Sequence, residues 1–291
     1  METVSSPLSD QLAHISPVIV VAVVMALTLV RFAVTKMQDS WARTIAEICD
    51  TVNFVLILAY LVIRPFAAEA FYIPSDSMEN TLLINDRLMV DKFSFRLHPP
   101  RQHDVLVFVA PVEATPERRD GINFIKRLIG LPGQTIQVKA AKLTIGQETI
   151  TPVGAAEGVD PHAYLRSRFG LGPLDSIKFF PDHILINGKE EVRPEEIAQR
   201  LNQLGAKVIL TPGQTLVDGK VEEELYTRED PGYNYPIDGK PLTVPPGHLF
   251  MMGDNRNRSD DSHMWGPLDE RRVVGRAAAI FWPLPRIGRI P

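Results

Sequence analysis

The sequence of 291 residues contains a single cysteine, Cys49, and no glycine among its first 120 residues. One thiol excludes an intramolecular disulfide and any structural zinc site built from cysteine thiolates. A strong charge of one sign is also lacking, since 31 Lys and Arg residues balance 35 Asp and Glu residues, and we therefore expect no nucleic-acid partner. The sequence offers no metal-ligand cluster and no phosphate-binding glycine loop, so we expect neither a metal nor an organic cofactor.

The glycine-free part contains two apolar stretches. Residues 17–34 are interrupted only by Arg31 near their end, and they are long enough to cross a bilayer as a helix. Residues 51–70 are predicted as a second membrane-spanning helix. A cleavable signal peptide is the alternative for the first stretch, but the preceding residues 1–16 carry no Lys or Arg, unlike the start of a signal peptide.

Charge placement predicts how such a pair of helices would be oriented. Arg31, Lys36 and Arg43 lie at the end of the first stretch or shortly after it, whereas the N-terminal tail has no basic residue. Cytoplasmic loops carry the excess of Lys and Arg, so residues 35–50 are predicted to form a cytoplasmic loop. The short tail, residues 1–16, and everything after residue 70 would then lie on the extracytoplasmic face.

From residue 71 onward, short apolar runs alternate with turns, which predicts a mainly β fold. Residues 104–109 form an uninterrupted apolar run typical of a strand buried on both faces, and residues 122–129 and 134–138 are predicted as further strands. We expect an antiparallel catalytic β domain from residues 71–139 and 246–291, with a second, smaller β subdomain inserted as residues 140–245.

Three Asx-Gly pairs in or near the insert predict type I′ hairpin turns: Asn187-Gly188, Asp218-Gly219 and Asp238-Gly239. Only residues 194–204 in this part are predicted to be helical, because Pro194 stands at the first turn and Gly205 follows the end.

Lys126 occupies an unusual place in the predicted strand 122–129. Alternation puts it on one face with Phe124 and Leu128, in an apolar row. One interpretation is an edge-strand lysine whose ammonium reaches water. The other is a desolvated amine whose lowered pKa makes it a general base, with Ser77 in the segment after the second apolar stretch as the nucleophile it would activate.

The two segments together resemble bacterial type I signal peptidase, a membrane-anchored serine endopeptidase of the Ser/Lys type (family S26) that removes signal peptides. The similarity is carried by five stretches in order: Phe71-Tyr-Ile-Pro-Ser-Asp-Ser-Met-Glu-Asn-Thr-Leu82, Asp104-Val-Leu-Val-Phe108, Phe124-Ile-Lys-Arg-Leu-Ile-Gly-Leu-Pro-Gly133, Gly247-His-Leu-Phe-Met-Met-Gly-Asp-Asn-Arg-Asn-Arg-Ser-Asp-Asp-Ser-His-Met-Trp-Gly266, and residues 275–288. The resemblance covers residues 71–291, with residues 140–213 matching poorly.

The resemblance implies roles for individual residues. Ser77 would be the nucleophile, Lys126 the general base, and the Ser75 hydroxyl one arm of the oxyanion hole. Ser259 would hydrogen-bond and orient the Lys126 amine, while Asp261, with His263 as its partner, would brace that corner. The family's pockets for small residues of an Ala-x-Ala cleavage site would be lined by Phe71, Ile73, Pro74, Met78, Leu82, Val107 and Ile125.

The resemblance also implies location and partners. The protein is expected in the bacterial inner (cytoplasmic) membrane as a multi-pass protein, with the bilayer and the signal peptides of preproteins as its partners. The alternatives are a specialised Ser/Lys processing peptidase and a catalytically impaired, membrane-anchored peptide-binding homologue. Ala68-Glu69-Ala70 itself resembles an Ala-x-Ala site, although small residues ending a helix are the preferred interpretation.

The chain departs from the family pattern at three positions that are usually glycine. Asp76, Asn85 and His103 stand there. Asp, Asn and His are the residue types most enriched at positive φ after glycine, so we expect the backbone turns to be kept. The Asp76 carboxylate is expected to point to solvent, because a negative charge facing Lys126 would favour the ammonium and weaken the base.

Overall fold

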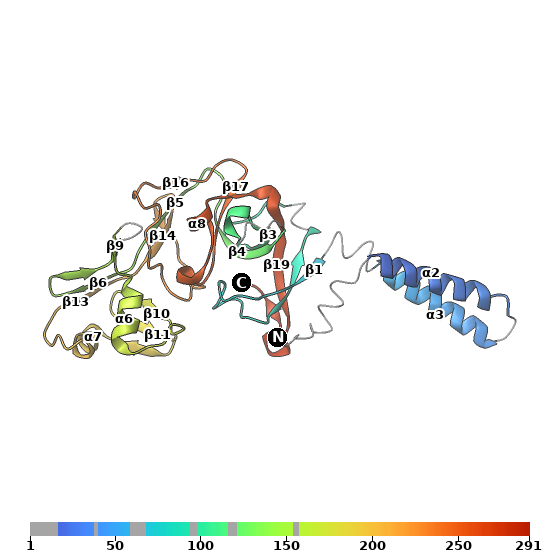
Figure 1. The fold of residues 1–291 in the computed structure, drawn as a ribbon, viewed down its shortest axis with the longest axis horizontal. Coiled ribbons are helices and arrows are strands. Elements are labelled where there is room, and N and C mark those ends of the chain that lie inside the picture. Colours follow the sequence, from blue (N-terminus) through green and yellow to red (C-terminus); the bar gives the residue numbers. More distant parts are fainter. Residues whose placement is uncertain (1–16, 38–39, 59–67, 94–97, 116–120, 154–156) are drawn as a thin grey trace.

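The computed structural model describes residues 17–37, 40–58, 68–93, 98–115, 121–153 and 157–291. Figure 1 shows an antiparallel helix pair at one end of the molecule and a β-rich body at the other. The predicted tail, residues 1–16, and the middle of the predicted second span, residues 59–67, lie outside the described residues.

The first helix, α2 (Pro17–Val34), has the predicted bounds. The second, α3 (Ser40–Ile57), begins eleven residues before the predicted start at residue 51, so most of the segment predicted as a connecting loop, residues 35–50, is helical. Helical periodicity explains the early start. Ala42, Cys49 and Asn53 are buried along one face of α3, and the charged residues between them are exposed.

Polar contacts join the two helices. The Asn53 side-chain amide donates to the Thr28 hydroxyl at 3.2 Å, and Arg31 forms an ion pair with Asp50 at 2.6 Å. Within the described residues, neither helix has the length and apolar character needed to cross a bilayer, so the prediction of two membrane-spanning helices is not supported.

Residues 68–70 also differ from expectation. They belong to strand β1 (Ala68–Tyr72), in which Ala68 is paired with Asp91 and Ala70 with Met89, rather than to the end of a helix. The antiparallel pairing of β1 with β2 outweighs the helix propensity of the alanines.

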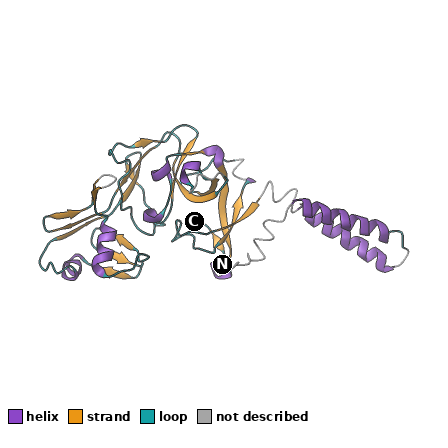
Figure 2. Cartoon of the chain, viewed as in Figure 1, coloured by secondary structure: helices purple, strands orange, loops and turns teal. Residues whose placement is uncertain are grey.

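The largest sheet of the described residues is antiparallel, with the strand order β1-β2-β19-β3-β4-β17-β18, to which β20 is added beside β19. Figure 2 shows these strands as the curved, strand-rich core of the body. Their bounds, after β1, are β2 (Arg87–Asp91), β3 (Val105–Val109), β4 (Asn123–Gly130), β17 (His248–Met252), β18 (Leu268–Asp269), β19 (Val273–Trp282) and β20 (Gly288–Arg289).

Strand β3 lies in the centre of this sheet and is buried on both faces, as its apolar run predicted. Val105 and Val107 pack into one apolar cluster with Ile73 and Leu88, whereas Leu106 and Phe108 pack into a second cluster on the other face. The mainly antiparallel β architecture is therefore confirmed, and both faces of the strand beside β4 are covered.

Between β4 and β17 the chain leaves the sheet and builds smaller sheets, each antiparallel. One contains β5 (Thr135–Lys139), β14 (Gln214–Val217), β15 (Lys220–Val221) and β16 (Leu242–Thr243); the others contain β6 (Lys142–Ile145), β7 (Glu148–Ile150) and β13 (Val208–Thr211), then β10 (Ile177–Phe179), β11 (Ile184–Ile186) and β12 (Glu190–Val192), and β8 (Pro152–Val153) with β9 (Glu157–Gly158).

The insert also contains two helices, α6 (Pro161–Phe169) and α7 (Pro194–Arg200), and a short α8 (Ser262–Trp265) follows β17. Helix α7 is shorter than predicted, because Asn202 adopts a positive φ of 57° soon after its end. Helix α6 was not predicted, although Asp160 caps its first turn and Pro161 occupies its first position.

Two of the three predicted hairpin turns are present. Asn187-Gly188 joins β11 to β12 and Asp218-Gly219 joins β14 to β15, with positive φ at both residues of each pair, as type I′ turns require. Asp238-Gly239 is different: only the glycine has positive φ, and the turn leads to the short strand β16 rather than closing a hairpin.

Candidate active site

The Ser77 and Lys126 side chains meet in the interior of the catalytic sheet. Lys126 projects from β4, and Ser77 lies in the loop that connects β1 to β2. The Lys126 Nζ donates to the Ser77 Oγ at 2.6 Å, and the two residues are only 4% and 7% exposed. The sheet therefore brings into direct contact an amine and a hydroxyl that are 49 residues apart in the chain.

Burial lowers the pKa of the Lys126 amine from 10.5 to about 8, against the opposing effect of four carboxylates, Asp261, Asp260, Asp254 and Asp76. A neutral amine in hydrogen-bond contact with a hydroxyl can accept its proton, which is the requirement for a general base. With a pKa near 8, roughly a tenth of the amine is neutral at pH 7 and about half at pH 8.

The loop between β1 and β2, called the serine loop below, places the Ser77 hydroxyl between the Lys126 amine and the Ser75 hydroxyl. The Ser75 Oγ lies 3.3 Å from the Ser77 Oγ, on the exposed side of the loop. The Asp76 carboxylate forms an ion pair with Arg258 at 3.1 Å and is partly exposed, in line with the expectation that it faces away from Lys126. Asp76 still contributes the weakest of the four electrostatic effects on the Lys126 pKa.

Ser259, predicted to orient the lysine, makes no such hydrogen bond. Its Oγ is buried and has no hydrogen-bond partner among the described residues. The side chain packs against Gly253, where a Cβ would overlap Ser259 and lie 2.5 Å from the Ser77 carbonyl oxygen. Ser259 is thus close to the Ser77 backbone, and the predicted contact with the Lys126 amine is absent.

Asp261 and His263 form the predicted pair. The fully buried Asp261 accepts hydrogen bonds from the Gly253 N–H at 2.9 Å and from the His263 Nδ1 at 2.7 Å. Burial would raise the pKa of the Asp261 carboxyl, but the His263 contacts and the Gly253 amide outweigh it, and the pKa is lowered. The His263 ring stacks on Tyr233 at 4.1 Å, which fixes its orientation.

The seven predicted pocket residues divide into two groups. Ile73, Met78, Leu82 and Val107 are buried members of one apolar cluster, which makes them core residues beneath the serine loop. The other three, Phe71, Pro74 and Ile125, keep some exposed surface. Only these three of the seven predicted pocket side chains reach the surface.

Two residue pairs near the site were not foreseen. The Arg127 guanidinium makes a bidentate ion pair with Asp254, at 2.9 and 2.7 Å, and both side chains are buried. Asn255 donates its backbone N–H to the Ser77 carbonyl at 3.0 Å and its side-chain amide to the Asp76 carbonyl at 3.1 Å. The only sign of the Arg127–Asp254 pair in the sequence was Arg127 itself, a charged residue in one row with Ile125 and Ile129.

The acidic and imidazole groups of the site do not form a metal site. Among the residues that the structure describes, no three His, Cys, Asp or Glu side chains converge as metal ligands. The chemistry available from the described side chains is nucleophilic attack by a serine that a buried amine deprotonates.

Comparisons with known proteins give one consistent result. The family profile described as signal peptidase, peptidase S26, matches residues 45–282. Signal peptidase I of Leptolyngbya laminosa is 32% identical over 82% of this chain and 81% of its own length. A probable signal peptidase I-2 of Synechocystis is 31% identical over 91% of this chain and 85% of its own, and signal peptidase I of Pseudomonas aeruginosa is 28% identical over 82% and 74%.

Proposed function

The chain belongs to the signal peptidase family, peptidase S26, and from that premise we propose that it is a serine endopeptidase that removes N-terminal signal peptides from exported preproteins. The observation that carries the proposal is the 2.6 Å hydrogen bond between the Lys126 amine and the Ser77 hydroxyl in a buried setting. A catalytically impaired binding homologue would not need this contact, nor the cost of burying an amine.

In the proposed reaction, the neutral Lys126 amine accepts the Ser77 proton while the Oγ attacks the scissile carbonyl carbon. The resulting ammonium protonates the leaving amine, and the acyl-enzyme ester remains on Ser77. Lys126, neutral again, then activates the water that hydrolyses this ester. The Ser75 hydroxyl, 3.3 Å from the Ser77 Oγ, is one proposed donor to the oxyanion, with the Ser77 N–H as the other.

Specificity for small residues before the cleavage site follows from the close packing around the serine. Met78 and Leu82, in the same loop as Ser77, are completely buried, which supports a shallow binding surface beside the serine. We assign recognition of an Ala-x-Ala sequence to the exposed parts of Phe71, Pro74 and Ile125, which exclude larger side chains sterically.

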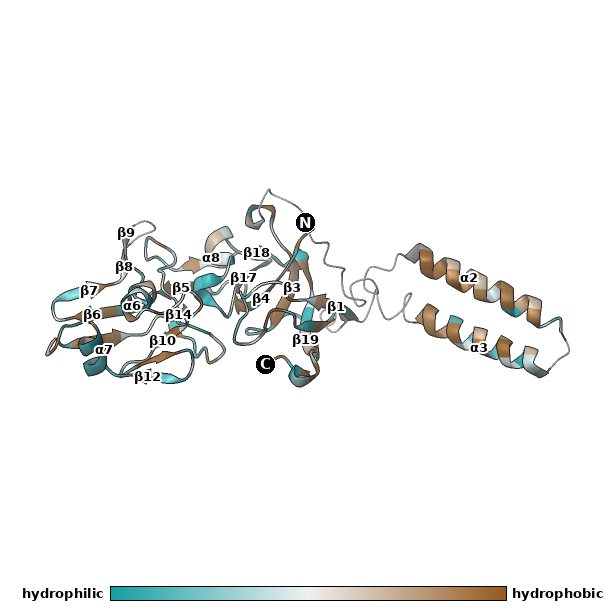
Figure 3. Cartoon of the chain, turned by 60° about the horizontal axis from the view of Figure 1, so that its bottom comes forward, coloured by the Kyte–Doolittle hydropathy of each residue, from teal (hydrophilic) through white to brown (hydrophobic). Residues whose placement is uncertain are grey.

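Attachment to the lipid bilayer is assigned to the helix pair α2–α3. Figure 3 shows α2 as mostly apolar and α3 as apolar segments interrupted by hydrophilic ones. Exposed large apolar side chains include Ile19, Val21, Met25, Leu29, Phe32, Ile48, Phe54 and Val55. An exposed apolar surface of this kind is stabilised by contact with lipid, and it would hold the enzyme beside substrates on the extracytoplasmic face of the bacterial inner membrane.

Cleavage of a preprotein tests the catalytic proposal. The protein purified in detergent, its Ser77→Ala variant and its Lys126→Met variant are incubated with a preprotein that has an Ala-x-Ala site and with the same preprotein carrying Phe at the residue before the cut. We expect cleavage of the first substrate by the wild type alone. An inert wild type, or cleavage that survives either substitution, refutes the assignment.

Flotation with phospholipid vesicles tests the attachment. Leu29→Lys should reduce the vesicle-bound fraction, whereas Ile209→Lys, which charges an exposed apolar side chain in the insert, should not. Equal effects of the two substitutions would contradict the assignment to α2 and α3.

A further inference from the structure

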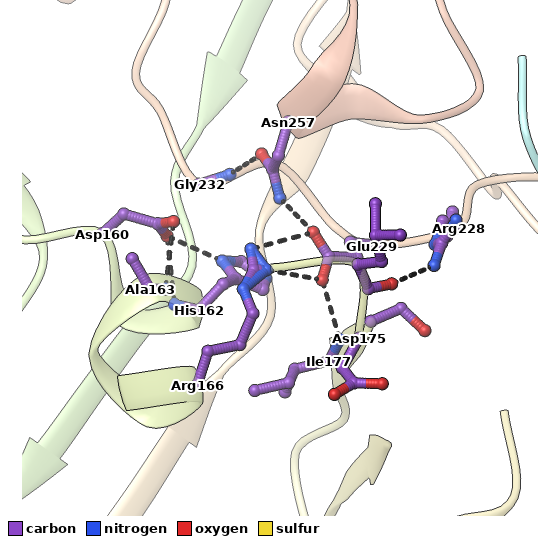
Figure 4. A network of polar contacts seen from close by, with 12 residues as sticks. Asp160, His162, Ala163, Arg166, Asp175, Ile177, Arg228, Glu229, Gly232 and Asn257 are labelled. Atoms are coloured by element: carbon purple, nitrogen blue, oxygen red, sulfur yellow. Dashed lines mark hydrogen bonds and ion pairs between the residues drawn. The ribbon is translucent and has the colours of Figure 1, made fainter. Parts of the chain in front are cut away.

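A largely buried acidic cluster in the insert contacts the loop of the candidate active site. It consists of Glu229 and Asp230, with Asp160 at the start of α6, and it surrounds His162 and Arg166. Figure 4 shows the side chains of α6 converging on Glu229 from one side and Asn257 approaching from the other. None of these residues takes part in the proposed reaction.

His162 is completely buried between two carboxylates. Its Nδ1 lies 2.8 Å from Asp160 and its Nε2 lies 3.2 Å from Asp230. Only an imidazolium, which carries a proton on both nitrogens, can donate to both carboxylates. Burial opposes the charge, but the two carboxylates outweigh it and raise the pKa of His162 to about 10.

The two cluster carboxylates from residues 229 and 230 also hold the backbone of the insert. Glu229 accepts from the Ile177 N–H at 2.7 Å. Asp230 accepts from the Phe179 N–H at 2.9 Å and from the Gly213 N–H at 2.5 Å. Since Glu229 is paired with Arg166 of α6 as well, the segment that contains both acids is fixed by a helix and a strand of the insert.

Asn257 connects this fixed segment to the loop of the candidate site. Its side-chain amide donates to the Glu229 carboxylate at 2.9 Å and to the Asp230 carbonyl at 3.1 Å. Its side-chain oxygen accepts from the Gly232 N–H at 2.7 Å, as Figure 4 also shows. All the hydrogen-bonding groups of the side chain are thus directed to the insert, two residues before Ser259.

The same loop contacts the nucleophile on its other side. Asn255 binds the Ser77 and Asp76 carbonyls, and Ser259 packs on Gly253 beside the Ser77 backbone. The loop from Gly253 to Asp261 is therefore held between the serine loop and the insert. A shift at Asn257 would move Asn255 and Ser259 together, because only one residue separates it from each.

We propose that Asn257 is a positioning residue, through which Glu229 and Asp230 of the insert set the Gly253–Asp261 loop against Ser77 and Lys126. This role rests on the proposed function. It assigns to the insert a task in the reaction although the insert contributes no reacting group, and it explains why a charged cluster is buried at this junction instead of apolar side chains.

The test uses Asn257→Asp, which removes both donations and places a carboxylate against Glu229. We expect kcat for a preprotein to fall about 10- to 100-fold with little change in KM. We also expect the kinetic pKa of Lys126 to rise, because a displaced loop would bury the amine less completely. Combining it with Glu229→Gln restores a donor opposite the new carboxylate, and it should recover at least a third of the lost kcat.

Asn187→Asp is the matched control. Asn187 also bridges by its side chain within the insert, to Asp175 at 2.8 Å and to the Ser176 N–H at 2.8 Å, but it has no contact with the loop. It should lower thermal stability as much as Asn257→Asp while leaving kcat and the kinetic pKa unchanged.

Equal effects of the two substitutions on kcat, or an Asn257→Asp enzyme with the wild-type kcat and kinetic pKa, would overturn the positioning role. A wild-type protein that does not cleave preprotein would refute the proposed function instead, so the two failures are distinguishable.

Discussion

Removing the negative charge of Asp260 should change the pKa of Lys126, the proposed base, in a way that can be measured. Asp260 is exposed and is the second strongest of the four negative charges that favour the Lys126 ammonium. Asp260→Asn removes that charge without changing the size of the side chain, so the pKa of Lys126 should fall below its value of about 8. Interactions through exposed charges typically amount to 0.2–1 kcal/mol, which corresponds to a shift of roughly 0.15–0.7 unit.

The shift has a predictable effect on rate. With a fall of about half a unit, the neutral fraction of Lys126 at pH 7 would rise from roughly 10% to roughly 25%, and kcat/KM would increase about 2.5-fold. Near pH 9.5 the amine is neutral in both proteins, so the two rates should converge. Asp182→Asn, which neutralises an exposed carboxylate in the insert, is the control.

The assay is the pH dependence of kcat/KM for preprotein cleavage from pH 6 to 10. If Asp260→Asn leaves the midpoint where the wild type has it, or moves it upward, the amine of Lys126 is not the group that limits the rate. A midpoint that moves equally in Asp182→Asn would show a general effect of net charge rather than a local one.

Two further predictions concern the same site. Lys126→Met should raise the free energy of unfolding by about 3 kcal/mol at pH 7. The cost of lowering the pKa from 10.5 to about 8 is fully present below pH 8 and disappears toward pH 10.5. Denaturant unfolding at pH 7 and 10.5 measures it, and an equal gain at both pH values would contradict it. Asp76→Gly should lower the kinetic pKa by less than one unit, since Asp76 is paired with Arg258; a full unit would mean that the carboxylate faces the amine.

The contact between Ser77 and Lys126 was predictable because each lies in a short segment with its own signal. An apolar row in a strand identified Lys126, and a resemblance to a known family identified both. The hydrogen bond from Ser259 was predicted from the same resemblance and is absent here. Its Oγ packs beside Gly253, a detail of side-chain packing that a motif does not specify.

The features that could not be predicted from the sequence depend on contacts between distant segments. Arg127 and Asp254 are 127 residues apart, and nothing in either segment indicates the other. Helix α3 was placed too late because Arg31, Lys36 and Arg43 were interpreted as marking a loop, whereas Arg43 is an exposed residue of a helix whose buried residues face α2.

The three positions where the family has glycine illustrate both outcomes. Asn85 and His103 have φ values of 77° and 72°, which confirms that the left-handed backbone is retained there. Asp76 is not among the residues with positive φ, so the prediction is wrong at this position. A side chain beside the nucleophile costs no backbone strain, and the carboxylate is available for its ion pair with Arg258.

The place of β19 in the sheet has a consequence for the order in which the protein is synthesised. This strand lies between β2 and β3, although β2 ends at Asp91 and β19 begins only at Val273. At typical translation rates of 5–20 residues per second, roughly 10 to 40 s separate the two. Until then, the hairpin that carries Ser77 and the hairpin that carries Lys126 lack the strand that joins them, so a chain still on the ribosome has a nucleophile and a base on two unjoined pieces of sheet.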